Sequence, residues 1–275
     1  MNIERVFVTP EMATEWLRHN HPKNRKLDRR TVSEYARLMK SGDFYETSDT
    51  IRFDTNGTLI DGQHRLSAIV EANVKRWMWV SYNNAPETML VIDTQRPRKL
   101  EARLSMAGAF EDEPKMRYSQ AHATIRSLVR NGYKSNIKLG DPEIIKLIEA
   151  FKEELVVVMN IAGKKSGSNA HINAAALSAL LNGEPAEDIY AFFRVFLKSE
   201  TDNRFGYNIS AALNLSRTFL ESKAKHNTIN AARLYPLTQN AIWNFLRGDR
   251  TTKYLKVPKT DRYPVADKIK KVLEG

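Results

Sequence analysis

The spacing of apolar and polar residues in the first ninety positions switches between the periods of strands and helices. Val6 to Val8 predicts a short strand, and Thr9-Pro10 predicts the start of a helix that runs to about Asn20. Proline is favoured there because the first helical position needs no amide donor. Asp28 then predicts the cap of a second helix, which ends at Gly42.

A hairpin and a third helix are predicted next. Residues 50–54 alternate like a strand, and Asn56-Gly57 separates them from Leu59-Ile60, which is a strong signal for a tight β-turn. The period then changes from two to 3.6, and a helix is expected to begin near Gly62. Its predicted apolar side consists of Leu66, Ile69, Val70 and Asn73. Residues 76–82 return to the composition of a strand.

Strands almost disappear after Pro86, where helical spacing and Gly, Pro, Asn and Asp punctuation dominate. The helical segments are 98–107, 114–131, 142–161, 170–182, 186–198, 208–224, 228–247 and 265–273. The pattern therefore predicts an α+β fold, in which a small mixed sheet with helices is followed by a mostly α-helical domain. We expect the first domain to span residues 1–108 and the second to span 109–275, with a basic C-terminal segment.

Charge and composition restrict the kinds of function. The 275 residues include 43 Lys and Arg against 32 Asp and Glu, a net charge of +11, which favours a polyanionic partner such as nucleic acid. Cysteine is absent, which excludes disulfides, thiolate zinc sites and thiol nucleophiles. Neither a signal-like segment nor an apolar run near twenty residues is present, so we expect a cytoplasmic protein with no membrane partner.

The excess of positive charge is concentrated in the C-terminal part. Residues 1–110 carry a net charge of +3 and residues 111–275 carry +8. Within the segment 247–271, Tyr254 and Tyr263 are interleaved with nine basic residues. Such a segment can contact a nucleic-acid strand, although a solvated tail with a last short helix explains it equally well. The candidate nucleic-acid contacts in it are Arg247, Arg250, Lys253 and Lys256.

The residues with the richest chemistry lie at a predicted strand-to-helix turn, Asp61-Gly62-Gln63-His64-Arg65. A strand leads into a glycine that opens a helix, so free backbone N–H groups and the positive end of the helix dipole point out of the turn. Such a turn binds phosphate, and we expect the side chains of His64 and Arg65 to face the incoming anion.

Each residue of this turn also has an assignable chemical role. Arg65 offers a planar fork of donors, His64 can exchange a proton near neutral pH, and Gln63 adds a neutral amide. Asp61 can orient the histidine, bind magnesium or act as a base. The candidate catalytic residues are therefore Asp61, His64 and Arg65. Taken singly, each also has a structural explanation, as a turn residue, a satisfied polar group or an ion-pair partner.

Two longer runs of sequence carry a resemblance to a known family. The run NRKLDRRTVSEYARLMKSGDF, followed by TIRFDTNGTLIDGQHRLSAIVEA, resembles the ParB/sulfiredoxin superfamily over roughly residues 5–105. In that superfamily a strand, a turn and a helix present a Gly-x-His-Arg or Gly-x-Arg-Arg signature. The chain is particularly similar to the DGQHR-bearing branch of phage and mobile-element proteins, many of which are labelled ParB-like nucleases. The expected location would then be the host cytoplasm.

The resemblance implies a nucleotide or phosphate ligand. Members of the superfamily hold CTP, ATP or ADP at the corresponding loop, so the implied cofactor is a nucleotide, with Mg²⁺ as a candidate ion. The implied binding residues are Gly62, Gln63, His64 and Arg65, together with Asn24 and Arg25 of a polar stretch that approaches the nucleotide. An exposed basic loop explains Asn24 and Arg25 equally well. Sulfinic-acid repair is excluded because the cysteine that sulfiredoxins need is missing. A convincing helix-turn-helix, as partitioning proteins have, cannot be located.

Three functions remain open at this point. The chain is either an enzyme that hydrolyses or transfers phosphate on DNA or a nucleotide, or a non-enzymatic DNA-binding regulator or assembly factor, or an interaction protein that binds nucleic-acid phosphate directly. Arg96 and Arg98 flank Pro97 in a polar turn and are further candidates for contact with a phosphate or a DNA backbone, although a turn that joins two domains explains them nearly as well.

Overall fold

The chain is divided into two compact units in a computed structural model. The first unit comprises Met1–Arg98 and Ile137–Pro142, and the second comprises Lys99–Asn136 and Glu143–Gly275. The short segment Ile137–Pro142 thus belongs with the first unit, although the chain has already entered the second. The structure describes residues 1–22, 24–90, 117–133, 138–162, 169–200, 206–224, 231–247 and 254–274.

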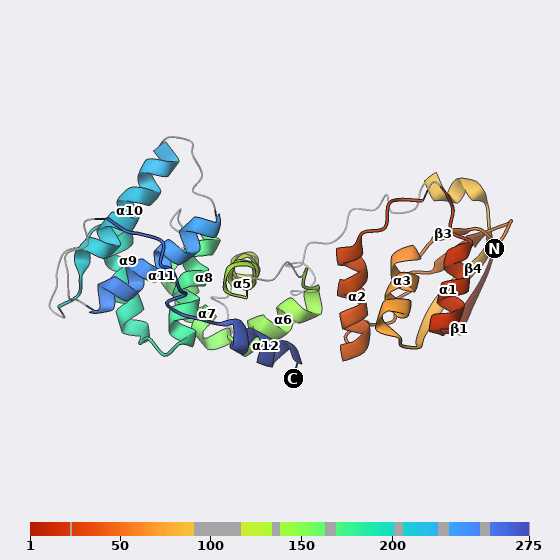
Figure 1. The fold of residues 1–275 in the computed structure, drawn as a ribbon, viewed down its shortest axis with the longest axis horizontal. Coiled ribbons are helices and arrows are strands. Elements are labelled where there is room, and N and C mark those ends of the chain that lie inside the picture. Colours follow the sequence, from red (N-terminus) through yellow and green to blue (C-terminus); the bar gives the residue numbers. More distant parts are fainter. Residues whose placement is uncertain are drawn as a thin grey trace. The chain divides into compact units, whose positions relative to one another are not determined.

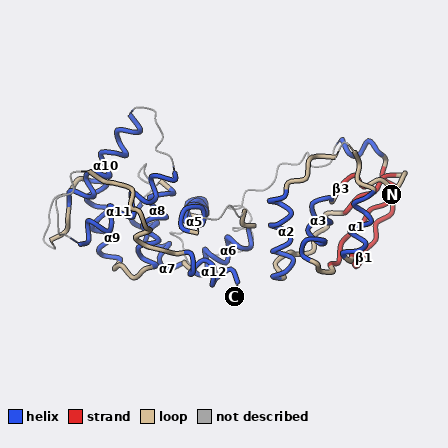
Figure 2. The backbone as a smooth tube through the Cα atoms, in the orientation of Figure 1, coloured by secondary structure: helices blue, strands red, loops and turns tan. Residues whose placement is uncertain are grey.

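The first unit combines a sheet with helices, which confirms its predicted α+β character (Figure 1). Its described elements, in chain order, are β1 (Asn2–Val8), α1 (Pro10–Arg18), α2 (Arg29–Ser41), β2 (Ile51–Asp54), β3 (Leu59–Asp61), α3 (Gln63–Ala72), β4 (Arg76–Asn84) and the 3₁₀ helix η1 (Pro86–Leu90). Figure 2 shows the three α-helices of this unit gathered beside its strands.

The four strands form one mixed sheet in the order β1-β4-β2-β3. The pairs β1 with β4 and β2 with β3 are antiparallel, whereas β2 and β4 run parallel. The hairpin between β2 and β3 contains the predicted Asn56-Gly57 turn, where Gly57 has a φ of +77°. The strand β1 has β4 on one side and lies at the edge of the sheet.

The helix boundaries follow the local signals in the sequence. The side chain of Thr9 accepts a hydrogen bond from the amide of Met12, and Pro10 opens α1. Asp28 caps α2 by accepting from the amide of Arg30, and Gly42 ends that helix with a φ of +82°. These predicted starts and stops are confirmed.

The core of the first unit lies between one face of the sheet and the helices. The helices α1, α2 and α3 contribute Ala13, Met39 and Leu66, all fully buried, and the sheet contributes Val8 and Val80 among others. The apolar side predicted for α3 is only partly correct. Leu66 and Ile69 are buried, but Val70 is 38% exposed and Asn73 ends the helix in a left-handed conformation.

The second unit contains helices and no strand among its described residues, which confirms the predicted helical region. Its helices are α5 (Tyr118–Gly132), α6 (Asp141–Ala150), α7 (Lys152–Ala162), α8 (Ala170–Leu181), α9 (Ala186–Lys198), α10 (Ile209–Ala224), α11 (Ala231–Arg247) and α12 (Ala266–Glu274). Within the described part of the chain, none of these helices combines the length and apolar character needed to cross a bilayer.

One predicted helix is divided in two. The segment 142–161 reads as a single helix, but α6 ends at Ala150 and α7 begins at Lys152. Phe151 stands at the break and is buried, as are Leu147 and Leu155 on either side of it. The apolar spacing continues across the break, so periodicity alone does not reveal it.

The C-terminal segment is anchored to the second unit by Tyr263, which corrects an expectation from the sequence. Tyr263 is only 2% exposed, and its carbonyl oxygen accepts a hydrogen bond from the buried side chain of Gln239. Its hydroxyl donates to Glu184 at 3.0 Å. This ring is therefore inaccessible to a stacking base, whereas the ring of Tyr254 is 73% exposed.

We expect Tyr263→Ala to lower the free energy of unfolding of the second unit by about 3 to 5 kcal/mol, because a large buried ring is removed. The matched variant Tyr254→Ala should change it by no more than about 0.5 kcal/mol, because that ring is exposed. Urea unfolding followed by far-ultraviolet circular dichroism measures both. Equal effects of the two substitutions would contradict the assignment of Tyr263 as the anchor.

Candidate functional site

The turn at the start of α3 has the strand-to-helix geometry expected from the sequence. Gly62 occupies the N-cap position with a φ of +103°, a conformation that side chains rarely adopt. A Cβ atom at Gly62 would lie 3.0 Å from Cγ1 of Ile51. The glycine is thus required by backbone conformation and by its contact with β2. The helix has no side-chain cap, which leaves its first amides to other partners.

Gln63 connects the turn to the polar segment that follows α1. Its Nε2 donates to the carbonyl oxygen of Arg25 at 2.6 Å, and its Oε1 accepts from Nδ2 of Asn20 at 3.0 Å. Asn24 in turn donates to Oδ1 of Asn20 at 2.9 Å. The structure therefore places Arg25 in contact with Gln63 and links Asn24 to the same side chain through Asn20, while their binding of a nucleotide stays a prediction.

His64 joins the amino ends of two helices. Its Nε2 accepts a hydrogen bond of 3.0 Å from the backbone amide of Asp28, the N-cap residue of α2. Because Nε2 accepts, a neutral His64 must carry its proton on Nδ1. The side chain is 6% exposed, so the imidazole lies inside the unit and fixes the position of the segment that ends at Asp28.

The environment of His64 favours its neutral form. Burial lowers the pKa of His64 below its ordinary value of 6.5, and the positive charge of Arg25 lowers the pKa further. The carboxylates of Asp28 and Asp61 act in the opposite direction, and Lys138 adds to the lowering. His64 is therefore neutral at pH 7, as the hydrogen bond to Asp28 requires.

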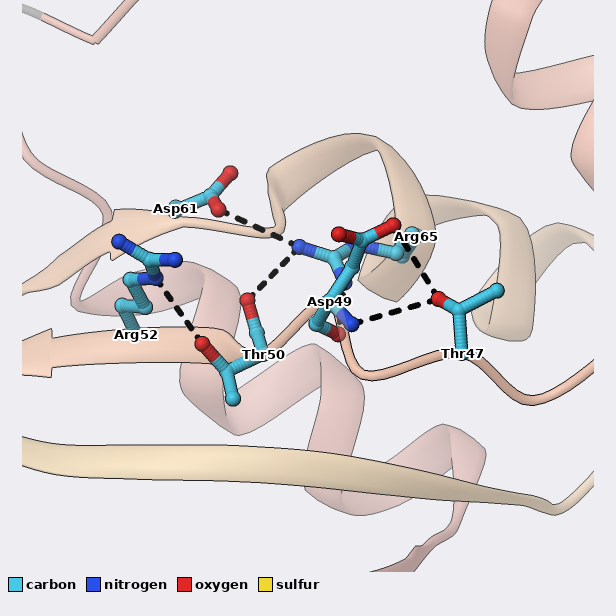
Figure 3. Close-up of polar contacts among 6 residues, drawn as sticks. All are labelled: Thr47, Asp49, Thr50, Arg52, Asp61 and Arg65. Atoms are coloured by element: carbon cyan, nitrogen blue, oxygen red, sulfur yellow. Dashed lines mark hydrogen bonds and ion pairs between the residues drawn. The ribbon is translucent and has the colours of Figure 1, made fainter. Parts of the chain in front are cut away.

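Arg65 turns back toward the chain that enters β2 (Figure 3). Its Nη1 donates to the carbonyl oxygen of Asp49 at 2.5 Å, and its Nη2 donates to that of Thr50 at 2.8 Å. Nη2 also lies 3.3 Å from Oδ2 of Asp61, and the Arg65 side chain is 15% exposed. The guanidinium thus holds the start of β2 against the first turn of α3.

The structure corrects how the motif presents its side chains. The sequence led us to expect His64 and Arg65 to face an incoming anion, but His64 points inward and Arg65 binds two backbone carbonyls. Asp61 pairs with Arg65 rather than orienting the histidine. A catalytic or ligand-binding role for these three residues stays a prediction, and it would require these contacts to be exchanged. Asn20, Asp49 and Thr50 are partners that the sequence gave no reason to single out.

The positive charge near the DGQHR turn belongs to residues 25–30, which Gln63 and His64 bind through hydrogen bonds. Arg25 and Lys26 precede α2, Arg29 and Arg30 form its first turn, and all four side chains are exposed. Asp28 is the acidic residue among them, and its carboxylate is already engaged by Thr31 and the amide of Arg30. We call the residues Arg25, Lys26, Arg29 and Arg30 the basic segment.

Comparison of the chain with family models, curated proteins and solved structures gives no significant match. The ParB/sulfiredoxin resemblance accordingly stays a prediction from the sequence.

Two of the candidate nucleic-acid contacts lie beside α11 in the second unit. The guanidinium of Arg247 lies 3.7 Å from the centre of the Trp243 ring and pairs with Glu184 at 2.6 Å. The carbonyl oxygen of Lys256 accepts from Asn240 at 2.9 Å, and its side chain is exposed. Arg262 also faces Trp243, at 5.4 Å. Cations are thus grouped around Trp243, a ring that the sequence analysis did not single out.

Other candidates cannot be placed. Arg96, Arg98, Arg250 and Lys253 lie outside the described residues. Within the described ranges, no group of three or more His, Asp or Glu side chains is arranged so that it could hold a metal ion.

We expect the stability of the first unit to fall as the pH is lowered from about 7.5 to about 5.5. Unfolded His64 takes up a proton near pH 6.5, whereas folded His64 resists protonation, so the unfolded state binds more protons in this window. The loss should begin near the ordinary pKa of histidine and level off below the folded pKa. Urea unfolding followed by tryptophan fluorescence measures it, because Trp16, Trp77 and Trp79 all lie in the first unit.

The variant His64→Gln should weaken this pH dependence, because glutamine can accept the Asp28 amide but does not titrate. His171→Gln is the matched control, since burial also lowers the pKa of His171, which lies in the second unit. An undiminished pH dependence of the first unit in His64→Gln would show that His64 is not the titrating group.

We also expect Gly62→Ala to lower the free energy of unfolding by about 2 to 4 kcal/mol, because it combines left-handed strain with the clash against Ile51. Gly57→Ala is the matched control: its φ is also positive, but nothing lies within 4 Å of the added Cβ, so a loss of only about 1 to 2 kcal/mol is expected. Urea unfolding of both variants separates steric contact from backbone strain. Equal losses would contradict the close packing of Gly62 on Ile51.

Proposed function

We propose that the chain is a ParB-like protein that binds phosphate-bearing ligands at the basic segment and acts with DNA. The observation that carries the proposal is the hydrogen bond from the Asp28 amide to His64, because it holds the amino ends of α2 and α3 together. Each helix amino end carries partial positive charge, and the two effects add where the ends meet. The exposed cations of the basic segment surround this place.

Electrostatics support the same location. Among the charges that act on the pKa of His64, Arg25 has the largest effect and lowers it; Asp28 and Asp61 raise the pKa, and Lys138 lowers it. Lys138 is held nearby by Glu34 at 2.9 Å and by Thr31 at 3.3 Å. An anion beside the basic segment would be stabilised by these charges as well as by the helix ends.

The uncapped amino end of α3 suits a phosphate, but residues 25–28 lie across it and limit access to its amides. Gly62, Gln63 and His64 are all buried, and Gln63 and His64 hold the segment in place. We therefore place the phosphate against the exposed side chains of the basic segment, in line with the two helix ends. ATP, ADP or CTP with Mg²⁺ is the proposed nucleotide class, following the superfamily resemblance.

Of the open functions, the contacts favour a non-enzymatic DNA-binding regulator or assembly factor over a nuclease, NTPase or phosphotransferase. Nε2 of His64 is engaged by a backbone amide, and Asp61 is paired with Arg65. Both candidates for proton transfer are thus used to hold the fold. Hydrolysis or transfer would need one of them to change partner on ligand binding.

The second unit supports contact with DNA. Trp243 is faced by Arg247 and Arg262, and the exposed side chains of Tyr254 and Lys256 belong to the segment that leads to Arg262. The net charge of +11 favours association with a polyanion over the whole chain. We propose that this cluster makes sequence-independent contacts with DNA phosphates.

The proposal is tested with a double variant, Arg29→Ala with Arg30→Ala. Alanine preserves the start of α2, so the change removes charge without disturbing the helix. Binding of a labelled DNA duplex should weaken, and the slope of log affinity against log salt should decrease by roughly 0.9 for each phosphate that the variant no longer neutralises. Calorimetric titration with ATP, ADP, CTP and GTP, with and without Mg²⁺, should show weaker nucleotide binding in the same variant.

Arg194→Ala is the matched control, because Arg194 is an exposed arginine of α9, with a side chain 56% exposed. It should leave the affinities and the salt slope unchanged. Equal nucleotide affinities and equal duplex affinities in the parent and the double variant would refute a phosphate site at the basic segment. Magnesium-dependent turnover of a bound nucleotide would favour the enzymatic alternative.

A further inference from the structure

The face of the sheet opposite the helices carries a group of aromatic residues. The register pairs Phe7 with Trp77 and Arg5 with Trp79 across β1 and β4. Side chains alternate between the two faces of a strand, and Val8, Met78 and Val80 point into the core. Phe7, Arg5, Trp77 and Trp79 therefore lie together on the outer face.

Several aromatic side chains of this region are open to solvent. Phe7 is 44% exposed and Trp77 is 46% exposed, and Tyr45, in the chain before β2, is 70% exposed. We call Phe7, Tyr45, Trp77 and Trp79 the aromatic face. Large exposed apolar groups that gather in one place on a protein usually mark a binding surface, because leaving them in water is unfavourable.

The rings are arranged around a fixed cation. The centres of the Phe7 and Trp77 rings lie 5.0 Å apart with an interplanar angle of 40°. The guanidinium of Arg5 lies 4.6 Å from the centre of the Trp77 ring, and both carboxylate oxygens of Glu46 hold it, at 2.8 and 2.7 Å. The indole of Trp77 thus contacts a fixed guanidinium and is still 46% exposed.

A shallow hollow that is open to solvent, with a cavity volume of about 20 Å³, adjoins these rings. Its walls include Tyr45, Trp77 and Trp79, and its polar lining includes Glu46, Asp49 and Arg65. Aromatic walls accept the flat face of a ring, and the carboxylate of Asp49 can accept a hydrogen bond from an amino group on the edge of that ring. The combination suits a nucleobase better than an aliphatic side chain.

Charge favours a nucleic-acid strand as the source of that base. Residues 1–110, which include the aromatic face, carry a net charge of +3. Arg52 lies on the outer face, because it pairs with Ser81 and its neighbours Ile51 and Phe53 are buried in the core. Lys75 is exposed just before β4, two residues from Trp77. Cations beside both ends of the aromatic face can neutralise phosphates while the rings stack on the bases between them.

We propose that the aromatic face binds the unpaired bases of a single-stranded nucleic acid. Trp77 and Phe7 stack on successive bases, and one base edge lies at the mouth of the hollow beside Asp49. This surface is distinct from the basic segment, and it selects single strands because a duplex keeps its base faces covered.

The test measures the affinity of the full chain for a labelled oligothymidylate of about twelve nucleotides and for a duplex of the same length, by fluorescence anisotropy. Trp77→Leu keeps an apolar side chain but removes the ring, and it should weaken single-strand binding by about fivefold to a hundredfold while leaving duplex binding unchanged. Trp77→Phe keeps an aromatic ring and should retain most of the parent's affinity for the single strand. Tyr45→Leu should also weaken single-strand binding, and its exposed position makes an effect on folding small.

Tyr190→Leu is the matched control, because Tyr190 is an aromatic residue of α9 that is 37% exposed. It should bind single strands as the parent does. The proposal is overturned if the parent does not bind the oligonucleotide, or if Trp77→Leu and Tyr45→Leu both bind it as tightly as the parent. It is also overturned if sedimentation shows that Trp77→Leu dissociates a dimer, since the face would then bind a second copy of the chain. The Arg29→Ala, Arg30→Ala variant keeps all four rings, so failure of the basic-segment proposal is detected separately.

Discussion

The contact of Gly62 with Ile51 is the constraint on which the first unit depends. The chain leaves β3 and enters α3 through a glycine with a φ of +103°, and a Cβ atom there would press against Ile51 at 3.0 Å. This close approach places the first turn of α3 beside the start of β2. The hydrogen bonds of Gln63, His64 and Arg65 then follow, since each side chain begins within reach of its partner.

The DGQHR motif in this way positions two surfaces. Gln63 and His64 hold the basic segment across the amino end of α3, whereas Arg65 holds the chain before β2 and lines the hollow of the aromatic face. In the sequence, Gln63, His64 and Arg65 resemble ligand-binding groups. In the structure, their side chains form hydrogen bonds with backbone atoms of other segments. The proposed phosphate and base sites both depend on these hydrogen bonds, because the bonds fix the position of the basic segment and of the chain before β2.

The second unit shows the same division between anchoring and exposed groups. Tyr263 and Gln239 fasten the C-terminal segment through buried hydrogen bonds, and this leaves Tyr254 and Lys256 at the surface. The two tyrosines of the basic C-terminal segment therefore differ in role: Tyr263 is a buried anchor, and Tyr254 is exposed to solvent. Burial of Tyr263 also raises its pKa well above the ordinary value for tyrosine, with the Glu184 carboxylate acting in the same direction, so the ring stays neutral as an anchor.

The sequence by itself determined the α+β class, the caps at Thr9 and Asp28, the Asn56-Gly57 turn and the strand-to-helix turn at Gly62, because each depends on local conformational preference and hydrophobic period. Tertiary structure alone decided where His64 and Arg65 point, because their partners, Asp28 for the first and Asp49 with Thr50 for the second, lie 15 or more residues away in the chain. It also decided the break at Phe151, across which the apolar period continues, and which tyrosine of the basic C-terminal segment is buried. Contacts between segments that are distant in the chain determine these features, so the spacing of residues within one segment does not predict them.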